Sequence, residues 1–250
     1  MVASFAPATL GAIALVFLFA GAVKGIIGLG LPTISMGLLT LAMPPAAAAS
    51  VLIVPSLVTN IWQLFTGPPL RAVVKRFGSL AAGIVVGTLW SVLPPVSSDS
   101  PFAQPALGGV LIVYGVHGLT ATRLPRASAC ERWLSPLVGY VTGAISAATG
   151  VFVIPAVPYL QSLALRKDEM VQALGLAFSV ATIALAVRLW NGAALSTAPL
   201  ALSIVAVVPA LAGMALGQRL RQRVSEETFR KGFFVTLIAL GLHMTINALL

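Results

Sequence analysis

Charged residues are scarce in this sequence, and acidic residues are the scarcest. Charged residues make up 8% of the 250, hydrophobic residues make up 58%, and only six residues are acidic. A soluble domain carries roughly 25% charged residues, so this chain has too few to cover a globule with a polar surface. The composition excludes a soluble globular protein and predicts one whose solvent is lipid.

Cysteine and histidine are almost absent. The single cysteine, Cys130, excludes a disulfide within the chain, and the only two histidines are His117 and His243. There is no CxxC pair and no Cys/His cluster, which are the patterns that indicate a structural metal site. We therefore expect neither a bound metal nor a cofactor.

Basic residues outnumber acidic ones and give a formal net charge of +9. In a soluble protein this excess would suggest nucleic-acid binding, but in a membrane protein basic residues hold loops on the cytoplasmic side. We therefore expect the lipid bilayer as a partner and no nucleic acid. Because no basic residue precedes Lys24, the apolar N-terminus is interpreted as a first membrane segment rather than a cleaved signal peptide.

Long hydrophobic runs fill most of the chain. A membrane span needs about 20 apolar residues, and short loops rich in Pro, Gly or charge separate the runs. The apolar stretches cover about 9–42, 46–66, 77–94, 104–121, 134–163, 170–190, 197–217 and 230–249. No linker is long enough to separate domains, so the sequence predicts one all-α, polytopic membrane domain.

The chain also repeats itself at long range, because glycines and their neighbours recur in the same order in its two halves. Gly21 and Gly25 match Gly139 and Gly143 at an offset of 118 residues, and the segment from Gln63 to Gly67 matches the segment from Arg188 to Gly192 at an offset of 125. At an offset of 126, Gly87 matches Gly213, and the segment from Gly115 to His117 matches the segment from Gly241 to His243. These matches predict two repeats, 1–121 and 134–250, joined by a cytoplasmic linker loop at 122–133.

Two of the apolar stretches, 9–42 and 134–163, are too long for one span. Each has about 30 residues, which as an unbroken helix would measure about 50 Å against a hydrocarbon core of about 30 Å. Each is also interrupted, at Gly28 to Pro32 and at Thr149 to Pro155. We therefore expect each stretch to fold as a hairpin with two re-entrant limbs of about 15 residues, too short at about 22 Å to be full spans.

The basic residues favour the hairpins. If each long stretch crossed the membrane once, six of thirteen basic loop residues would lie inside and seven outside, whereas with two hairpins all thirteen lie inside, as the positive-inside rule requires. The thirteen are Arg71, Lys75, Arg76, Arg123, Arg126, Arg132, Arg166, Lys167, Arg219, Arg221, Arg223, Arg230 and Lys231. This topology places both termini outside and inverts the second repeat relative to the first. Inverted repeats with broken helices are typical of secondary transporters, whose sites lie near the membrane midplane.

The two interruptions supply most of the candidate substrate-binding residues. Glycine lets backbone approach a ligand, and a helix that restarts at proline presents free N–H groups to an anion. Broken backbone at membrane depth is tolerated only where it lines a cavity or is buried in protein. The candidates are Gly25, Gly28, Gly30, Pro32, Thr33 and Ser35 in the first hairpin and Thr142, Gly143, Ser146, Thr149 and Gly150 in the second. The alternative is that these small residues only pack helices closely together.

Lys24 is the most informative single residue. It is the only lysine inside an apolar stretch, and intramembrane charges are costly and usually functional. The alternative is a side chain that snorkels to the interface. Arg188, its repeat counterpart Gln63, and Asn60 are further candidates to line the cavity, although Arg188 is close enough to a loop to snorkel.

No acidic residue is predicted at the midplane. The six acids, all in expected loops, are Asp99, Glu131, Asp168, Glu169, Glu226 and Glu227. His117 and His243 could relay protons, but both lie near helix ends, which favours an interfacial role. A site with a lysine, hydroxyls and helix N-termini but no carboxylate favours a small anion as its ligand.

The pattern G-x-x-x-G-x-x-G-x-G-x-P from Gly21 to Pro32, its echo from Gly139 to Pro155, and the two-half layout resemble the TauE/SafE family, also called the sulfite exporter or toluene-sulfonate uptake permease family. The resemblance covers nearly the whole chain. It implies transport of sulfite, sulfonates or related small organic anions across the plasma membrane, the inner membrane in bacteria. It implies neither one substrate nor one direction, and Thr142 stands where the first hairpin has Lys24, so the two hairpins need not contribute equally.

The sequence thus predicts a secondary transporter of small anions that works by alternating access at a site between the hairpins. The alternative is an anion channel of the same architecture, which would conduct without saturation or countertransport. An enzyme is not expected, because no paired nucleophile and base and no metal cluster is present. The sequence does not specify which ion, if any, is coupled to transport, and it does not specify the oligomeric state.

Overall fold

The computed structural model describes most of the chain, namely residues 7–67, 69–96, 102–120, 130–195, 197–221, 223 and 225–248, with only the backbone at 197, 198 and 226. Asp99, Arg123 and Arg126, together with residues 122–129 of the expected linker loop, lie outside the described residues.

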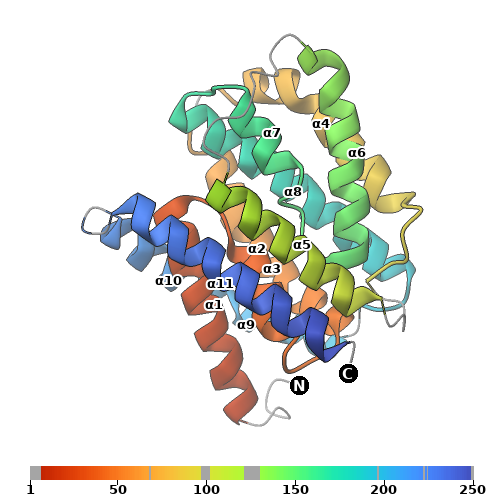
Figure 1. Ribbon diagram of the computed structural model, residues 1–250, viewed down its shortest axis with the longest axis vertical. Helices are drawn as coiled ribbons and strands as arrows, with labels where there is room; N and C mark the ends of the chain where they lie inside the picture. Colours follow the sequence, from red (N-terminus) through yellow and green to blue (C-terminus); the bar gives the residue numbers. More distant parts are fainter. Residues whose placement is uncertain are drawn as a thin grey trace.

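Within the described part the chain is entirely helical (Figure 1). The helices are α1 (Pro7–Ile27), α2 (Leu31–Leu39), α3 (Pro45–Leu64), α4 (Leu70–Leu89), α5 (Ala103–Thr120), α6 (Glu131–Thr149), α7 (Ala156–Ser162), α8 (Lys167–Asn191), α9 (Thr197–Val205), α10 (Val207–Leu220) and α11 (Glu226–Asn247). The predicted all-α fold is confirmed.

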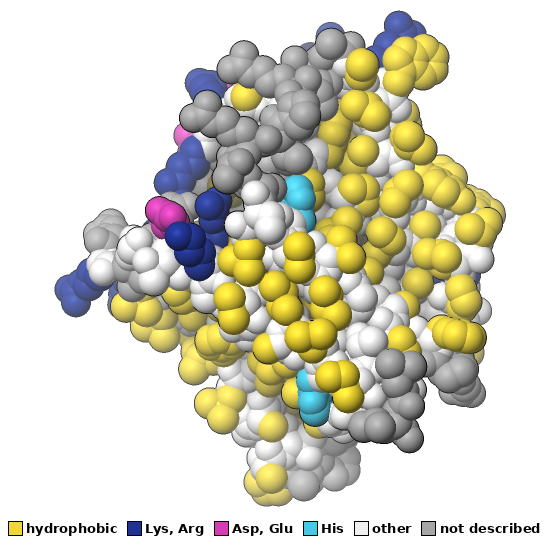
Figure 2. Space-filling view, in the orientation of Figure 1, with side chains coloured by type: hydrophobic (Ala, Val, Ile, Leu, Met, Phe, Trp, Pro, Cys, Tyr) yellow, Lys and Arg dark blue, Asp and Glu magenta, His cyan; other side chains and the backbone are white. Residues whose placement is uncertain are grey.

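The surface of the molecule is suited to lipid. Six stretches of the described chain are long and apolar enough to cross a membrane, namely α1, α3, α4, α8, Pro199–Leu220 and Glu227–Asn247. Hydrophobic side chains are spread widely over the face shown in Figure 2. All four tryptophans, Trp62, Trp90, Trp133 and Trp190, are exposed, as is usual for indoles at membrane interfaces. These features confirm a multi-pass membrane protein.

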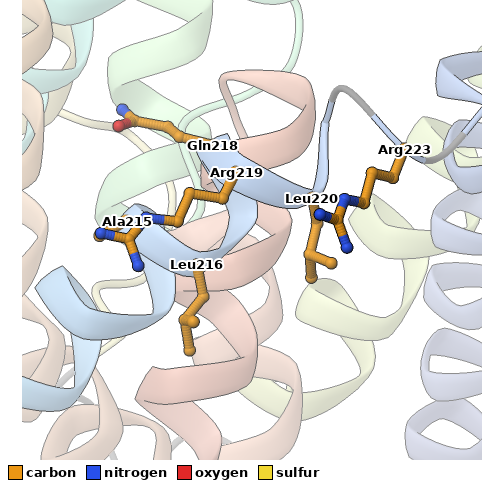
Figure 3. A pocket seen from close by; sticks show the side chains of 6 residues that line it. All are labelled: Ala215, Leu216, Gln218, Arg219, Leu220 and Arg223. Carbon is orange, nitrogen blue, oxygen red and sulfur yellow. The ribbon is translucent and has the colours of Figure 1, made fainter.

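Basic side chains gather at the margins of this apolar surface (Figure 2). At the end of α10, Arg219 and Arg223 lie beside the exposed Leu216 and Leu220 and line a groove of about 760 Å³ (Figure 3). Arginines that extend past apolar side chains toward water are typical of a membrane–water boundary.

Both of the long apolar stretches are broken at the predicted glycines. The first stretch changes from α1 to α2 through Gly28 and Gly30, whose φ angles are 80° and 107°. The second changes from α6 to α7 at Gly150, whose φ is 71°. Residues other than glycine rarely adopt these left-handed backbone conformations, so the glycines end the helices at these points.

The limbs on either side of each break are unequal, contrary to the expected pairs of about 15 residues. α1 and α2 have 21 and 9 residues, and α6 and α7 have 19 and 7. A helix of 21 residues measures about 31 Å, so the first limb is long enough to span the hydrocarbon core and only the second is short. The limbs are unequal because each break lies past the middle of its apolar stretch. In addition, the first limbs begin before the predicted start of the stretch, at Pro7 and Glu131.

Helices from opposite halves of the chain pack side by side. α1 packs along α10, α6 along α4, α3 along α8, and α5 along α11 (Figure 1). The repeated glycines lie in these contacts, because a Cβ atom on Gly21 would come within 2.2 Å of Ala210 O and one on Gly139 within 2.2 Å of Leu80 O. Small residues at such positions let helix backbones touch.

Candidate substrate site at the two helix breaks

Lys24 lies inside the protein, on the last turn of α1 before the first break. Its side chain is 2% exposed. The ammonium donates hydrogen bonds to Thr59 Oγ1, at 3.0 Å, and to Asn60 Oδ1, both on α3. The side chain therefore points into the helix bundle and not toward an interface.

The residues that hold Lys24 form a network across three helices. Asn60 donates through Nδ2 to Ser56 Oγ at 3.2 Å and to Thr182 Oγ1 of α8 at 3.5 Å. Ser56 and Thr182 lie 3.4 Å apart and share a further hydrogen bond. All of these side chains are buried. The network fixes the carbonyl oxygen of Asn60 toward Lys24, because the amide nitrogen is engaged on the other side.

The first break is held by Gln63. Its Nε2 donates to Gly28 O at 2.6 Å, and the Gly28 N–H donates to Lys24 O at 2.8 Å. The helix resumes at α2 with Pro32 in its first turn. Thr33 Oγ1 and Ser35 Oγ are fully buried and have no hydrogen-bond partner among the described residues. Hydroxyls without partners in an apolar interior are costly, which marks this turn as a place where a ligand could bind.

The second break contains hydroxyls but no buried charge among the residues described. Thr149 Oγ1 donates to Ile145 O at 2.7 Å and accepts from the Val151 N–H at 3.2 Å. Thr142 Oγ1 donates to Val138 O within its own helix. Ser146 Oγ is buried with no partner within the described structure. The two breaks are therefore alike in backbone shape and different in charge.

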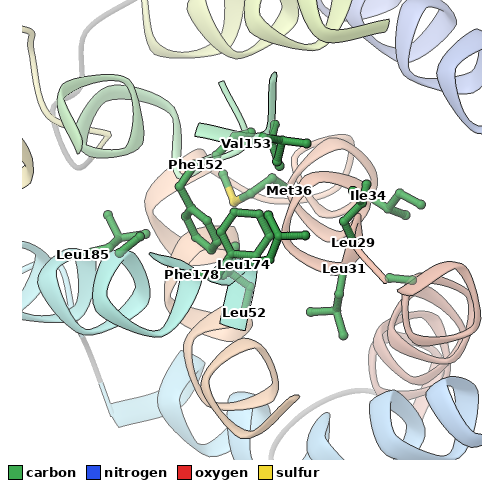
Figure 4. Close-up of a cluster of buried hydrophobic side chains, with 14 of the residues drawn as sticks. Leu29, Leu31, Ile34, Met36, Leu52, Phe152, Val153, Leu174, Phe178 and Leu185 are labelled. Carbon is green, nitrogen blue, oxygen red and sulfur yellow. The ribbon is translucent and has the colours of Figure 1, made fainter. Parts of the chain in front are cut away.

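Apolar side chains fill the space between the breaks (Figure 4). A Cβ atom on Gly150 would lie 2.9 Å from Met36 Cε of α2, so the two broken segments meet there. Phe152 packs on Phe178 of α8, with ring centroids 5.2 Å apart. Leu29, Leu31, Leu52 and Leu174 complete this central apolar cluster. A ligand that reached both breaks would have to displace some of these side chains.

Two predicted site residues, Gly25 and Gly143, lie in helix contacts. A Cβ atom on Gly25 would be 2.3 Å from Met214 O of α10, and one on Gly143 would be 2.2 Å from Ile84 O of α4. The structure therefore gives both residues a packing role, as the alternative interpretation expected for small residues.

Arg188 lies apart from the Lys24 network. It is half-buried, and its Nη1 donates to Leu89 O at the end of α4, at 2.6 Å. It follows Thr182 on α8 by six residues, about 9 Å along the helix axis. The structure brings Asn60 and Gln63 to Lys24 and the first break but does not bring Arg188 there.

Sequence reasoning missed Ser56, Thr59 and Thr182. The first two share one face of α3 with Asn60 and Gln63, because all four positions follow the helical period of 3.6 residues. That polar stripe in an apolar helix was a signal that could have found them. Thr182 has no such signal, because its partners come from a distant part of the chain.

The acidic residues in the described part lie at helix N-termini rather than in loops. Glu131 begins α6, Asp168 and Glu169 lie in the first turn of α8, and Glu227 lies in the first turn of α11. Negative charge stabilises these ends through the helix dipole. Three of them form surface ion pairs, namely Glu131 with Arg76, Glu169 with Arg166, and Glu227 with Lys231. No group of three potential metal ligands occurs in the part of the chain that the structure describes.

Comparison with protein families identifies the family of the chain. The sequence model of the family described as "Sulfite exporter TauE/SafE" matches residues 13–244. No curated protein and no solved structure matches the chain. Because the match covers nearly the whole chain, including both breaks, the protein belongs to the TauE/SafE family of membrane transporters.

Proposed function

We propose that the protein is a secondary transporter that moves sulfite, organosulfonates or related small organic acids by alternating access. The observation that carries this proposal is Lys24, a buried ammonium whose recorded partners are a hydroxyl and an amide. A buried charge is costly without an opposite charge, and no carboxylate among the described residues contacts Lys24. A small anion would supply the missing charge.

The proposed binding site is centred on the first break. Lys24 has three N–H groups, and two of them find acceptors in the described structure, which leaves one for an oxyanion. Gly28, Gly30, Pro32, Thr33 and Ser35 provide a helix N-terminus and hydroxyls that suit the same ligand. From the second break, Ser146, Thr149 and Gly150 would complete the site after the central apolar cluster rearranges.

We further propose that residues 1–121 and 134–250 are inverted repeats. The order of elements supports this proposal, because each half has a long helix, a break, a short helix and three further apolar helical stretches, with α9 and α10 together forming the stretch Pro199–Leu220 in the second half. The pairing of helices also supports it. α1 packs along α10 and its counterpart α6 along α4, whereas α3 pairs with its counterpart α8 and α5 with α11. A pseudo-two-fold axis that relates the two halves produces this pattern, in which each helix pair is matched by the pair of its counterparts.

Two matching clefts add to this support. One lies between α1, α2 and α11, and the other lies between α5, α6 and the segment after α4. The second cleft is lined by Phe102, just before α5, and by Ala103, Ala106 and Val110 of α5, and the first is lined by Thr228, Phe229, Gly232 and Thr236 of α11. Each α11 position follows its counterpart in the second cleft by 126 residues, the offset that relates Gly87 to Gly213.

The central apolar cluster favours a transporter over an anion channel. It separates the two breaks, and a channel needs a continuous wet path when it opens. Reconstitution into proteoliposomes tests the proposal directly. Uptake of labelled sulfite, methanesulfonate, toluenesulfonate and acetate should saturate with concentration and be stimulated by the same anion inside. Flux that rises linearly without counterflow would identify a channel, and the absence of flux for all these anions would refute the proposal.

A further inference from the structure

A cavity of about 370 Å³ leads from the protein surface to the first break. Its inner wall is formed by Gly28 and Leu29, and α8 contributes Lys167 and Leu174. Gln161 and Arg221 line the remaining sides. The Gly28 N–H donates to Lys24 O, so the cavity ends one helical turn from Lys24, the residue proposed to bind the anion.

Positive charge marks the mouth of this cavity. Lys167 is exposed at the start of α8, and Arg221 is half-buried beyond the end of α10. No acidic residue is among the described residues that line the cavity, and the carboxylate of nearby Glu169 is paired with Arg166 at 2.9 Å. Clefts lined by one sign of charge concentrate ions of the opposite sign. The cavity is therefore suited to small anions.

The inner end of the cavity is closed by two leucines. Leu29 and Leu174 line the cavity and also belong to the central apolar cluster that separates the breaks (Figure 4). Leu29 is 9% exposed and Leu174 is 3% exposed. They stand between the water-accessible space and the buried side chains of Met36 and Phe152.

The second break has a cleft of its own, of about 300 Å³, in which Thr149 lies among apolar side chains of α5, α6 and the segment after α4. The segment after α4 folds against α6, where the Val96 N–H donates to Ala147 O at 2.7 Å. Val96 is 2% exposed. Ala147 precedes Gly150 by three residues, so this contact lies over the end of α6, next to the second break. The two breaks therefore differ in the lining of their clefts, which includes basic side chains at the first break and no charged side chain among the described residues at the second.

We propose that this cavity is the cytoplasmic vestibule through which the transported anion reaches the first break. Lys167 and Arg221 attract the anion, and Leu29 and Leu174 form the gate between the vestibule and Lys24. The identity of the ligand as a sulfonate-like anion rests on the proposed function, whereas the charge and the sidedness of the cavity do not.

Charged thiol reagents can test the vestibule without measuring transport. Gln161→Cys, in a Cys130→Ser background, places a thiol in the cavity wall. Its reaction rates with an anionic (sulfonatoethyl) and a cationic (trimethylammonioethyl) methanethiosulfonate are compared in vesicles of neutral lipid. Inside-out and right-side-out vesicles show which side gives access. Gln218→Cys is the matched control position, since Gln218 lies in the groove at the end of α10 (Figure 3) and outside the cavity.

We expect Gln161→Cys to react only from the cytoplasmic side and faster with the anionic reagent. Lys167→Gln should lower the ratio of anionic to cationic rates about threefold to tenfold, because one charge at several ångströms acts oppositely on the two reagents. Lys167→Arg should preserve the ratio. Lys75→Gln removes the same charge from the same predicted side but not from the cavity, and it should change the ratio less than twofold. Lys167→Gln should leave the ratio at Gln218→Cys unchanged.

Access from the outer side, or equal effects of Lys167→Gln and Lys75→Gln, would overturn the vestibule. Saturating methanesulfonate should slow labelling of Gln161→Cys if the anion occupies the cavity. If the charge effect is present but no sulfonate protects the thiol and none is transported, the proposed function fails while the positively charged vestibule stands. Size-exclusion profiles of each variant confirm that the labelled protein is folded.

Discussion

At the scale of single residues, the proposed site depends on the buried ammonium of Lys24. Its fold-stabilising partners, Thr59 and Asn60, are neutral, so they satisfy hydrogen bonds without cancelling the charge. A site of this kind should attract anions, whereas a carboxylate partner would neutralise the ammonium. The arrangement is costly for stability, and in our proposal the transported anion compensates the charge.

Replacing Lys24 with glutamine should weaken anion binding about 10- to 100-fold. The reason is the loss of one charge-assisted hydrogen bond, typically worth about 1.5–3 kcal/mol. Glutamine can still donate to Asn60 and Thr59, so the protein should remain monodisperse in detergent. Equilibrium binding of labelled sulfite or sulfonate measures the effect, with Lys75→Gln as the control for loss of a surface charge. Unchanged affinity in Lys24→Gln would place the site elsewhere.

Asn60→Asp should separate folding from binding. The new carboxylate would face the Lys24 ammonium directly and form a buried ion pair, so thermal stability should be kept. Binding of the anion should be lost, because the ammonium is then neutralised and the added negative charge repels the ligand. Asn60→Leu is the contrasting variant, and it should destabilise the protein by about 3–5 kcal/mol because it leaves the buried charge with one partner fewer. Normal anion affinity in Asn60→Asp would contradict the proposed role of Lys24.

At the scale of secondary-structure elements, close glycine contacts hold the broken helices against helices of the other half. α1 touches α10 at Gly21 and Gly25, and α6 touches α4 at Gly139 and Gly143. These contacts leave no room for a side chain. They fix the first limbs in place, so movement during transport would fall on the short limbs α2 and α7 and on the central apolar cluster between the breaks.

Gly25→Ala tests whether this glycine packs helices or lines the substrate site. The added methyl would lie 2.3 Å from Met214 O, so α10 must shift, and overpacking of this kind costs about 1–3 kcal/mol. The melting temperature in detergent should fall. Gly78→Ala is the matched control, since nothing lies within 4 Å of its added Cβ, and it should not lower stability. Intact stability with lost binding in Gly25→Ala would assign the residue to the site instead.

At the scale of the whole molecule, the prediction concerns which loops face the cytoplasm. The inverted topology places residues 71–76, 123–132, 166–169 and 219–231 inside and both termini outside. Thr228→Cys, in a Cys130→Ser background, should therefore be labelled by an impermeant maleimide only in inside-out vesicles, because the 219–231 segment is rich in basic residues. Labelling of this position from outside intact cells would contradict the inverted arrangement.

A second whole-molecule prediction follows from the position of the acidic residues. Glu131, Glu169 and Glu227 form ion pairs with exposed partners, and surface pairs contribute little. Neutralising any one of the six acids to its amide should therefore leave anion affinity within a few-fold. Loss of binding in one such variant would show that its carboxylate reaches the site.

The sequence by itself determined the solvent, the helical class and the places where the helices break. Scarce charge requires lipid, and Gly28, Gly30 and Gly150 can adopt backbone conformations that other residues avoid. Lys24 was also conspicuous in the sequence, because a lone lysine in an apolar stretch is costly wherever it points.

Only the tertiary structure decided which residues surround Lys24 and which small residues pack helices. Thr182 meets Asn60 across 122 residues of chain, and Gly25 meets Met214 across 189, distances over which no local pattern carries information. The sequence could not distinguish a glycine that approaches a ligand from one that approaches a helix, because both need only the absence of a side chain. That choice depends on which surface lies opposite, and packing between the two halves of the chain sets that surface.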